Sequence, residues 1–401
     1  MRICMVTYSF YENDNRVMRY AETLAARGDT VDVISLRRPG QAEKGHPHGV
    51  NVYRLQERSR NERGKFTYLW RILRFFAAAA AWLTVHHARE KYDIIHVHSV
   101  PDFLVFAATI SKWMGAKLVL DIHDILPELY ASKFGLSQQG LLFRMLLFVE
   151  RISTAFADYV IIANHLWRER LVARSVPAEK CIALMNYPDQ TIFYPREITR
   201  KDGKFVLLYP GTLQGFQRLD IAVRALPLLV KDLPNVELHL YGEGDAKNGL
   251  IELTRQLGLE DRVFFHAPRP IREIAEIMSQ ADLGVVTKDA QSFANEAQST
   301  KILEFMSLGV SVVVTDTKIE HYYFDDSLVE FFRSGDERDF ARAALRIATD
   351  ADLRAMRVTN ASRFAAEHSW ARAQHLYLDM LDGLVRKTPA QKALPQTSPL
   401  L

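Results

Sequence analysis

The stretch NEAQSTKILEFMSLGVSVVVTD, residues 295–316, shows how this chain is built. Ser299 and Thr300 are of the residue types that cap helices, and the apolar residues after them keep helical spacing as far as Gly309, a typical helix end. The β-branched run that follows, ending at Thr315, predicts a buried strand. The stretch is therefore expected to form one helix–strand unit of an α/β fold.

Similar units repeat along the 401 residues, because short β-branched runs alternate with helical patterns from the first residue onward. This alternation is typical of parallel sheets with helices on their faces. Strands are expected at residues 2–7, 30–36, 50–55, 94–98, 117–123, 159–164 and 181–186, and again at 205–209, 236–241, 263–266, 283–286, 311–315 and 328–332.

A polar stretch with two prolines and a glycine, residues 187–204, interrupts this rhythm and indicates a domain boundary. The end of the chain is rich in Pro, Ser and Gln, which predicts a flexible tail. The expected organisation is an N-terminal domain over 1–195, a C-terminal domain over 203–369, a helix over about 370–387 and a tail over 388–401.

The composition, 48% hydrophobic and 25% charged, is that of an ordinary globular protein large enough for two cores. The two cysteines, Cys4 and Cys181, each lie inside an apolar stretch, which argues against a disulfide framework or a thiolate metal site. The sequence opens directly as a strand, without the pattern of a secretory signal. A cytoplasmic protein is expected.

Charge is distributed unevenly. Residues 1–200 hold 27 basic and 20 acidic residues, a net charge of +7, against 24 and 28, a net charge of −4, in the remainder. Much of the excess lies between Arg54 and Arg74, next to the aromatic, alanine-rich segment 66–87. The segment's uncharged core is shorter than the roughly 20 residues of a membrane span. Either it packs on the first sheet, or residues 54–87 contact a membrane surface; no nucleic acid partner is expected.

Two carboxylates, Glu296 and Glu304, flank the start of the helix in residues 295–316. Free backbone N–H groups near Thr300 and Lys301, together with the positive end of the helix dipole, favour phosphate binding. The Lys301 ammonium adds a point charge. A carboxylate on either side suits a ligand with hydroxyls around a diphosphate.

This pattern resembles the donor site of the retaining glycosyltransferases of family 4, which have the GT-B fold. The resemblance implies two Rossmann-like domains facing each other across a cleft, with a C-terminal helix that crosses back to the first domain. It also implies that Glu304 binds the ribose hydroxyls, that Glu296 approaches the transferred sugar as a catalytic residue, and that Thr300 and Lys301 lie near the diphosphate.

Further matches to the family follow in order along the chain. Gly211 and Thr212 resemble its phosphate loop, YGEG at 241–244 its second loop, and residues 370–377 its crossover segment. The family's usual basic residues after the loop glycine are absent here. Arg218 is the candidate replacement, since a guanidinium can engage two phosphate oxygens; the alternative is an exposed helix residue.

In the first half, His123 and Asp124 come just past the end of a predicted strand, where open α/β sheets bind ligands, and Glu128 follows. The resemblance implies that His123 helps position the donor sugar or acceptor; the alternative is a histidine bonded to a neighbouring loop. His96 and His98 alternate along a strand and are expected to be core partners rather than metal ligands.

The family often has a glycine-rich loop after its first strand. This chain instead has Asn15 and Arg16 in an Asp-x-Arg-Val pattern. Donor and acceptor are expected to meet this loop through Arg16, the alternative being a solvated arginine at a helix start.

The predicted function is transfer of a hexose-type sugar, with retention, from a nucleotide-diphosphate sugar to an acceptor hydroxyl, without metal or cofactor. The acceptor is expected to be a lipid-linked or polysaccharide intermediate of cell-surface glycan synthesis, on the inner face of the membrane. The alternatives are a sugar-nucleotide 2-epimerase, which needs no acceptor, and a non-catalytic nucleotide-sugar binding protein, which the altered phosphate loop favours.

Overall fold

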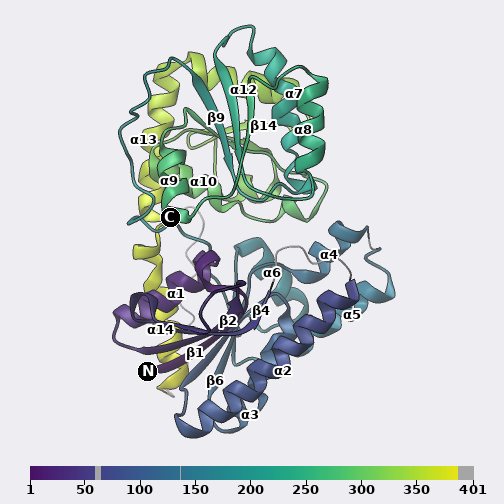
Figure 1. Ribbon diagram of the computed structural model, residues 1–401, viewed down its shortest axis with the longest axis vertical. Coiled ribbons are helices and arrows are strands. Elements are labelled where there is room, and N and C mark those ends of the chain that lie inside the picture. The colour runs from purple at the N-terminus through teal and green to yellow at the C-terminus, as the bar shows by residue number, and fades with distance from the viewer. Residues whose placement is uncertain (59–64, 136, 387–401) are drawn as a thin grey trace. The chain divides into compact units, whose positions relative to one another are not determined.

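A computed structural model describes residues 1–58, 65–135 and 137–386 of the chain. Contacts divide these residues into two compact units. Within the described residues, unit 1 comprises Met1–Asn186 and residues 374–386, and unit 2 comprises Tyr187–Ala373. Each unit has its own mainly parallel sheet with helices on both faces (Figure 1). The expected pair of Rossmann-like domains is confirmed, whereas their arrangement across a cleft stays a prediction, and the expected tail lies outside the described residues.

Within the described residues, the sheet of unit 1 has the order β3-β4-β2-β1-β5-β6-β7-β8, and β3 alone runs antiparallel to its neighbour. All seven predicted strands of this half are present. The sequence did not predict β3, because two residues are too short to show an alternating pattern. The strands are β1 (Arg2–Phe10), β2 (Thr30–Arg37), β3 (Lys44–Gly45), β4 (Asn51–Glu57), β5 (Ile94–His98), β6 (Lys117–Ile122), β7 (Tyr159–Ile162) and β8 (Cys181–Ala183).

Helices cover both faces of this sheet, with α1 and α14 on one face and α2, η3, α3 and α5 on the other (Figure 1). The returning C-terminal helix is confirmed: Tyr377 of α14 stacks on Tyr20 of α1, with ring centres 4.3 Å apart. The helices are α1 (Asn15–Ala26), α2 (Lys65–Arg89), η3 (Asp102–Ala108), α3 (Thr109–Trp113), α4 (Leu126–Phe134), α5 (Leu141–Phe156), α6 (His165–Arg174) and α14 (Trp370–Val385), with short turns η1 (Tyr11–Asn13), η2 (Pro47–Gly49) and η4 (Ala178–Lys180).

The segment 66–87 belongs to α2. Ile72, Phe75, Ala79 and Leu83 recur at helical spacing and are buried against unit 1, so the packed-helix alternative is confirmed for one face of α2. The part from Thr67 to Arg89 is long and apolar enough to cross a membrane by length and composition, a test that core helices also pass.

The expected basic cluster between Arg54 and Arg74 is wrong at Arg54. This arginine lies on β4, is 8% exposed, and bonds Glu12 at 2.5 Å, because the strand points its side chain inward. It therefore adds no charge to a cationic surface. Arg60 and Arg63 of that cluster lie outside the described residues.

In the described part of unit 2, all strands are parallel and have the order β11-β10-β9-β12-β13-β14, matching the six predicted strands. The connections reverse direction between β9 and β12, and open α/β sheets bind ligands at the carboxyl ends of strands beside such a point. The strands are β9 (Phe205–Pro210), β10 (Val236–Tyr241), β11 (Val263–His266), β12 (Leu283–Val286), β13 (Val312–Thr315) and β14 (Glu330–Phe332).

In unit 2, α7, α8 and α12 cover one face of the sheet, and α9, α10 and α13 the other (Figure 1). A Cβ at Gly284 of β12 would lie 2.6 Å from the ring of Phe305, so this glycine lets α10 pack closely on the sheet. The helices are α7 (Leu219–Leu229), α8 (Lys247–Gln256), α9 (Ile271–Ser279), α10 (Thr300–Leu308), α11 (Lys318–Tyr323), α12 (Glu337–Thr349) and α13 (Ala351–Glu367), with turns η5 (Gly215–Gln217) and η6 (Phe293–Asn295).

Candidate functional site

In unit 2, the central strand β9 ends in a loop that begins with a glycine. Gly211 has φ of +143°, and a Cβ there would lie 2.5 Å from Cε and 3.0 Å from Nζ of Lys301. Lys301 belongs to the first turn of α10, and its ammonium lies 5.1 Å from the ring centre of Tyr209. Glycine at 211 therefore leaves room for a lysine side chain beside the loop.

The YGEG loop packs directly on this first loop. A Cβ on Gly242 would lie 1.8 Å from the carbonyl oxygen of Gly211, and one on Gly244 would lie 2.1 Å from that of Leu213. The Gly211 N–H donates to the Tyr241 carbonyl at 2.8 Å, which fixes the two loops together. The glycines of this motif are needed for backbone contact.

We expect Gly242→Ala to lower the melting temperature of the protein, because the added methyl group forces the two loops apart. Overpacking of this kind costs about 1–3 kcal/mol. The matched control is Gly249→Ala on α8, where a Cβ meets no atom within 4 Å and should be neutral or stabilising. Thermal unfolding of both variants provides the measurement, and equal melting temperatures would contradict the proposed loop packing.

The N-terminus of α10 carries positive charge at the carboxyl end of the sheet. Ser299 is the N-cap residue, but its side chain makes no capping bond, contrary to the expected cap. The side chain of Lys301 makes no hydrogen bond or ion pair with any residue in the described part of the chain. Burial lowers the pKa of its ammonium, and the nearby Glu304 carboxylate partly opposes this effect. Lys301, with the N–H groups of Thr300 and its own, can therefore bind an anion.

Glu296 lies just before α10 and is held from α11. The Lys318 ammonium bonds its Oε1 at 2.9 Å, and the Lys318 N–H donates to Oδ1 of Asn295 at 2.8 Å. The side chain of Glu296 is 15% exposed. The structure thus places the two predicted carboxylates, Glu296 and Glu304, on either side of the start of α10.

A buried ion pair, which the sequence did not predict, holds the loop that precedes α10. Lys288, two residues past the end of β12, donates to the carbonyl of Ala297 at 2.7 Å and pairs with Glu320 of α11. Burial lowers the pKa of Lys288 and raises that of Glu320. The pair fixes the backbone that carries Glu296. A lysine two residues after an apolar strand was the available signal.

The two remaining residues predicted to bind the donor are Arg218 and Thr212. Arg218 precedes α7 with φ of +45°, and its Nε bonds Oδ1 of Asp220 at 3.0 Å. Thr212 is exposed, and its carbonyl accepts from the Tyr209 hydroxyl at 2.9 Å. A phosphate role for Arg218 stays a prediction, and Asp220 would compete for its guanidinium.

In unit 1, His123 follows the end of β6 and is 21% exposed. Its Nε2 lies 3.1 Å from Oδ2 of Asp121. Burial works against protonation, but Asp121 outweighs it and raises the pKa of His123 above its usual value. Asp124, the next residue, also has a raised pKa, because burial disfavours its charge.

The expected contact of Arg16 with donor and acceptor is wrong, because the side chain of Arg16 is buried instead of lying in an open loop. Its Nε and Nη2 bond the two carboxylate oxygens of Asp121, both at 2.8 Å. Its Nη1 donates to the Leu184 carbonyl and to Oδ1 of Asn186. Arg16 therefore orients Asp121, whereas its neighbour Asn15 is exposed at the start of α1.

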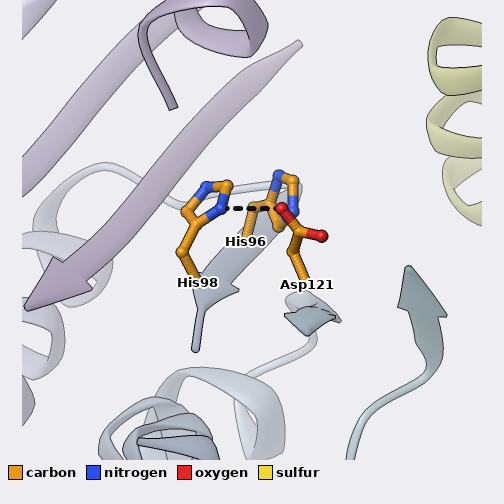
Figure 2. A group of neighbouring side chains, drawn as sticks. All are labelled: His96, His98 and Asp121. Atoms are coloured by element: carbon orange, nitrogen blue, oxygen red, sulfur yellow. Dashed lines mark hydrogen bonds and ion pairs between the residues drawn. The ribbon is translucent and has the colours of Figure 1, made fainter. Parts of the chain in front are cut away.

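His96, His98 and Asp121 converge from β5 and β6 and have the atom types of a metal site (Figure 2). Nδ1 of His98 lies 3.1 Å from Asp121, and Nδ1 of His96 lies 2.9 Å from the Tyr377 hydroxyl. Burial lowers the pKa of both histidines. Because Arg16 already binds both oxygens of Asp121, a divalent cation would lie beside a guanidinium. His96 and His98 are both fully buried, which confirms their expected position in the core.

The expected place of Glu128 at the ligand site is also wrong, because this residue of α4 lies in a buried ion pair. Its oxygens accept from Nη1 and Nη2 of Arg174 at 2.5 and 3.0 Å, and Arg174 also bonds Glu150. Glu128 is 8% exposed. Its carboxylate connects α4, α5 and α6 rather than facing a ligand.

We expect His123 to stabilise the protein more at low pH than at high pH. Because its folded pKa is raised, its contribution is present below the unfolded value, about 6.5, and is lost as the pH rises through the folded pKa. The melting temperature of wild type should exceed that of His123→Gln by the largest margin at pH 5.5 and by the smallest at pH 9. A constant difference across this range would contradict the Asp121–His123 pair.

Comparisons with known proteins match each half of the chain to a glycosyltransferase domain. One family model, "Glycosyl transferase 4-like domain", matches residues 14–186, and another, "Glycosyl transferases group 1", matches residues 191–364. Among relatives, N-acetyl-alpha-D-glucosaminyl L-malate synthase of Bacillus anthracis is 22% identical over 301 residues, which are 73% of this chain and 72% of that protein.

Solved structures share the fold over almost the whole chain. Sucrose-phosphate synthase of Thermosynechococcus elongatus superposes with a TM-score of 0.77 at 18% identity, covering 97% of this chain and 100% of that one. HepE of Anabaena, in complex with UDP and glucose, gives 0.73 at 19% identity, covering 96% and 100%.

Proposed function

The chain belongs to the family 4 glycosyltransferases of the GT-B fold, which take a sugar from a nucleotide sugar, and on this premise we propose the finer activity. It moves a hexose-type sugar, with retention, to a hydroxyl of a lipid-linked or polysaccharide acceptor in cell-surface glycan synthesis. The observation that carries the proposal is the anion site at the start of α10, between Glu296 and Glu304.

Each donor group has a proposed partner in this site. Lys301 and the first N–H groups of α10 bind the diphosphate, because an unpaired ammonium and a helix N-terminus both attract phosphate oxygens. Glu304, one turn further along α10, binds the ribose hydroxyls. Glu296, held by Lys318, binds the transferred sugar. We propose that no metal is needed, since the Lys301 ammonium and the N-terminus of α10 supply the positive charge.

His123 is the proposed catalytic residue of unit 1. Asp121 holds its Nε2, and the raised pKa favours an imidazolium that donates hydrogen bonds. Such a group can orient a hydroxyl of the donor sugar or acceptor. Asn15 and Asp124 are proposed acceptor contacts, because both lie near the carboxyl ends of the unit 1 strands.

The proposed reaction is a front-face substitution. The acceptor oxygen bonds to the anomeric carbon on the side from which the nucleoside diphosphate leaves, while the bond from that carbon to the phosphate oxygen breaks. The acceptor proton passes to the leaving phosphate oxygen. Lys301 lowers the barrier by stabilising the negative charge that develops on the diphosphate.

Release of nucleoside diphosphate, measured with a panel of nucleotide sugars in the presence and absence of lipid-linked acceptors, tests the proposal. A transferase releases it only with an acceptor, a 2-epimerase converts the donor without one, and a binding protein does neither. The anomeric configuration of the product, read by NMR, tests retention. Full activity in the double variant Glu296→Gln, Glu304→Gln would refute the donor assignment, because both changes remove charge and keep shape.

A further inference from the structure

Helix α5 of unit 1 carries an exposed apolar stripe. Leu141, Met145, Phe148 and Ile152 recur at intervals of three and four residues, so they lie on one face of the helix. Leu141 is 74% and Phe148 62% exposed. The opposite side of α5 is buried in unit 1 through residues such as Phe143. The stripe is therefore a second apolar face on a helix whose first face already packs on the core.

Neighbouring helices extend this surface. Trp70 of α2 is 68% and Trp113 of α3 78% exposed. Both α2 and α5 pack on η3: the ring centres of Phe76 and Phe103 lie 6.1 Å apart, and those of Phe106 and Phe156 lie 5.0 Å apart. We define the apolar face of unit 1 as the exposed large apolar residues of α5, of α3 with its C-cap residue, and of the N-terminal half of α2. Its members are Leu69, Trp70, Leu73, Ile110, Trp113, Met114, Leu141, Leu142, Met145, Phe148 and Ile152.

The exposed charges on the described residues of the helices in and beside the apolar face have one sign. In the described residues of α2, η3, α3, α4 and α5, the acidic side chains are Asp102, Glu128 and Glu150, and all three are buried. The exposed charged side chains of these helices are basic: Arg74, Arg89, Lys133, Arg144 and Arg151. A surface that is apolar in the middle and cationic around it matches an anionic bilayer.

We propose that the apolar face of unit 1 docks on an anionic lipid bilayer. The α5 stripe enters the boundary between headgroups and acyl chains, Trp70 and Trp113 lie at the interface that tryptophan favours, and Arg144 and Arg151 meet lipid phosphates. A second copy of the chain is a poorer occupant, because pairing this face with itself brings arginines of like charge together. The contact centres on α5, which lies outside the basic cluster expected from the sequence.

This inference deepens the proposed function, since a lipid-linked acceptor would lie in the same bilayer, but its test needs neither donor nor acceptor. The full chain is sedimented with phosphatidylcholine vesicles, with and without added phosphatidylglycerol. We expect binding only to the anionic vesicles, weakened by salt. Equal binding to both kinds of vesicle, or binding to neither, would overturn the proposal.

Two variants locate the contact. Met145→Ser with Phe148→Ser removes apolar area, and Arg144→Glu with Arg151→Glu reverses charge; each should weaken vesicle binding at least about tenfold. The matched control, Leu257→Ser with Met356→Ser, changes exposed apolar residues of unit 2 and should bind as wild type does. Unchanged binding in both α5 variants would also overturn the proposal.

Two further measurements separate other causes of weak binding. Every variant should keep the melting temperature of wild type and the same thermal shift with nucleotide sugar, so that failure of the donor site and failure of the docking face are distinguishable. Light scattering reports the oligomeric state. A wild-type dimer that becomes monomeric in the α5 variants, without vesicle binding, would assign the face to self-association and reject the bilayer.

Discussion

Lys301→Met is expected to lower kcat/KM for sugar transfer by about a hundred- to a thousandfold, because one preorganised charge at the leaving group is worth about that much. The methionine side chain is unbranched like that of lysine, so it should keep the packing beside Gly211 and Tyr209 while losing the ammonium. The loss should therefore appear without a fall in melting temperature. Steady-state release of nucleoside diphosphate measures it.

The matched control for this prediction is Lys231→Met, which removes an exposed ammonium elsewhere in unit 2. Its kcat/KM should equal that of wild type. If the two lysine variants behave alike, the charge of Lys301 has no specific role and the anion site at the start of α10 is misassigned.

Asp121→Ala is expected to destabilise the protein by about 3–5 kcal/mol, which is the usual cost of leaving one member of a buried ion pair without its partner. The carboxylate of Asp121 accepts two bonds from Arg16 and lies 3.1 Å from both His98 and His123. Its removal leaves a buried guanidinium without a counter-charge. Calorimetric unfolding, compared with that of wild type, measures the effect.

The double variant Arg16→Met, Asp121→Leu should recover much of this loss, because it removes both charges and keeps apolar volume. Asp261→Ala is the surface control, since the Asp261 side chain is 74% exposed. Should Asp121→Ala unfold at the same temperature as Asp261→Ala, the buried network would contribute nothing to stability.

The fold could be predicted from the sequence, because the patterns that indicate its strands and helices are local. Each β-branched run that predicted a strand became one, since a parallel strand buried on both faces needs a continuous apolar run. Strand ends were less accurate: β1 continues to Phe10, three residues past its predicted end, because Phe10 pairs with Leu36 of β2 after a register shift.

The candidate donor residues could be picked out for the same reason. Glu296, Lys301 and Glu304 lie within nine residues, and one turn of α10 fixes the spacing of Lys301 and Glu304. The partners of Arg16 and Glu128 were not readable, because they lie 105 and 46 residues away along the chain. No local pattern distinguishes an arginine that binds a ligand from one that binds a distant carboxylate.

The apolar stripe of α5 was missed for a different reason. The sequence LLFRMLLFVERISTAF has apolar residues around most of the helix, which is typical of a helix buried on several sides. Only the structure shows that Phe143 faces the core while Phe148 faces solvent. Exposure of this kind depends on which neighbouring elements cover the helix, and the sequence of the helix does not contain that information.

Calorimetric titration of wild type, Glu304→Gln and Lys301→Met with nucleotide-diphosphate sugars tests the proposed donor site directly. We expect at least one donor to bind wild type and raise its melting temperature, and each variant to bind it at least about tenfold more weakly. Equal affinity in wild type and both variants would contradict a donor site at the start of α10.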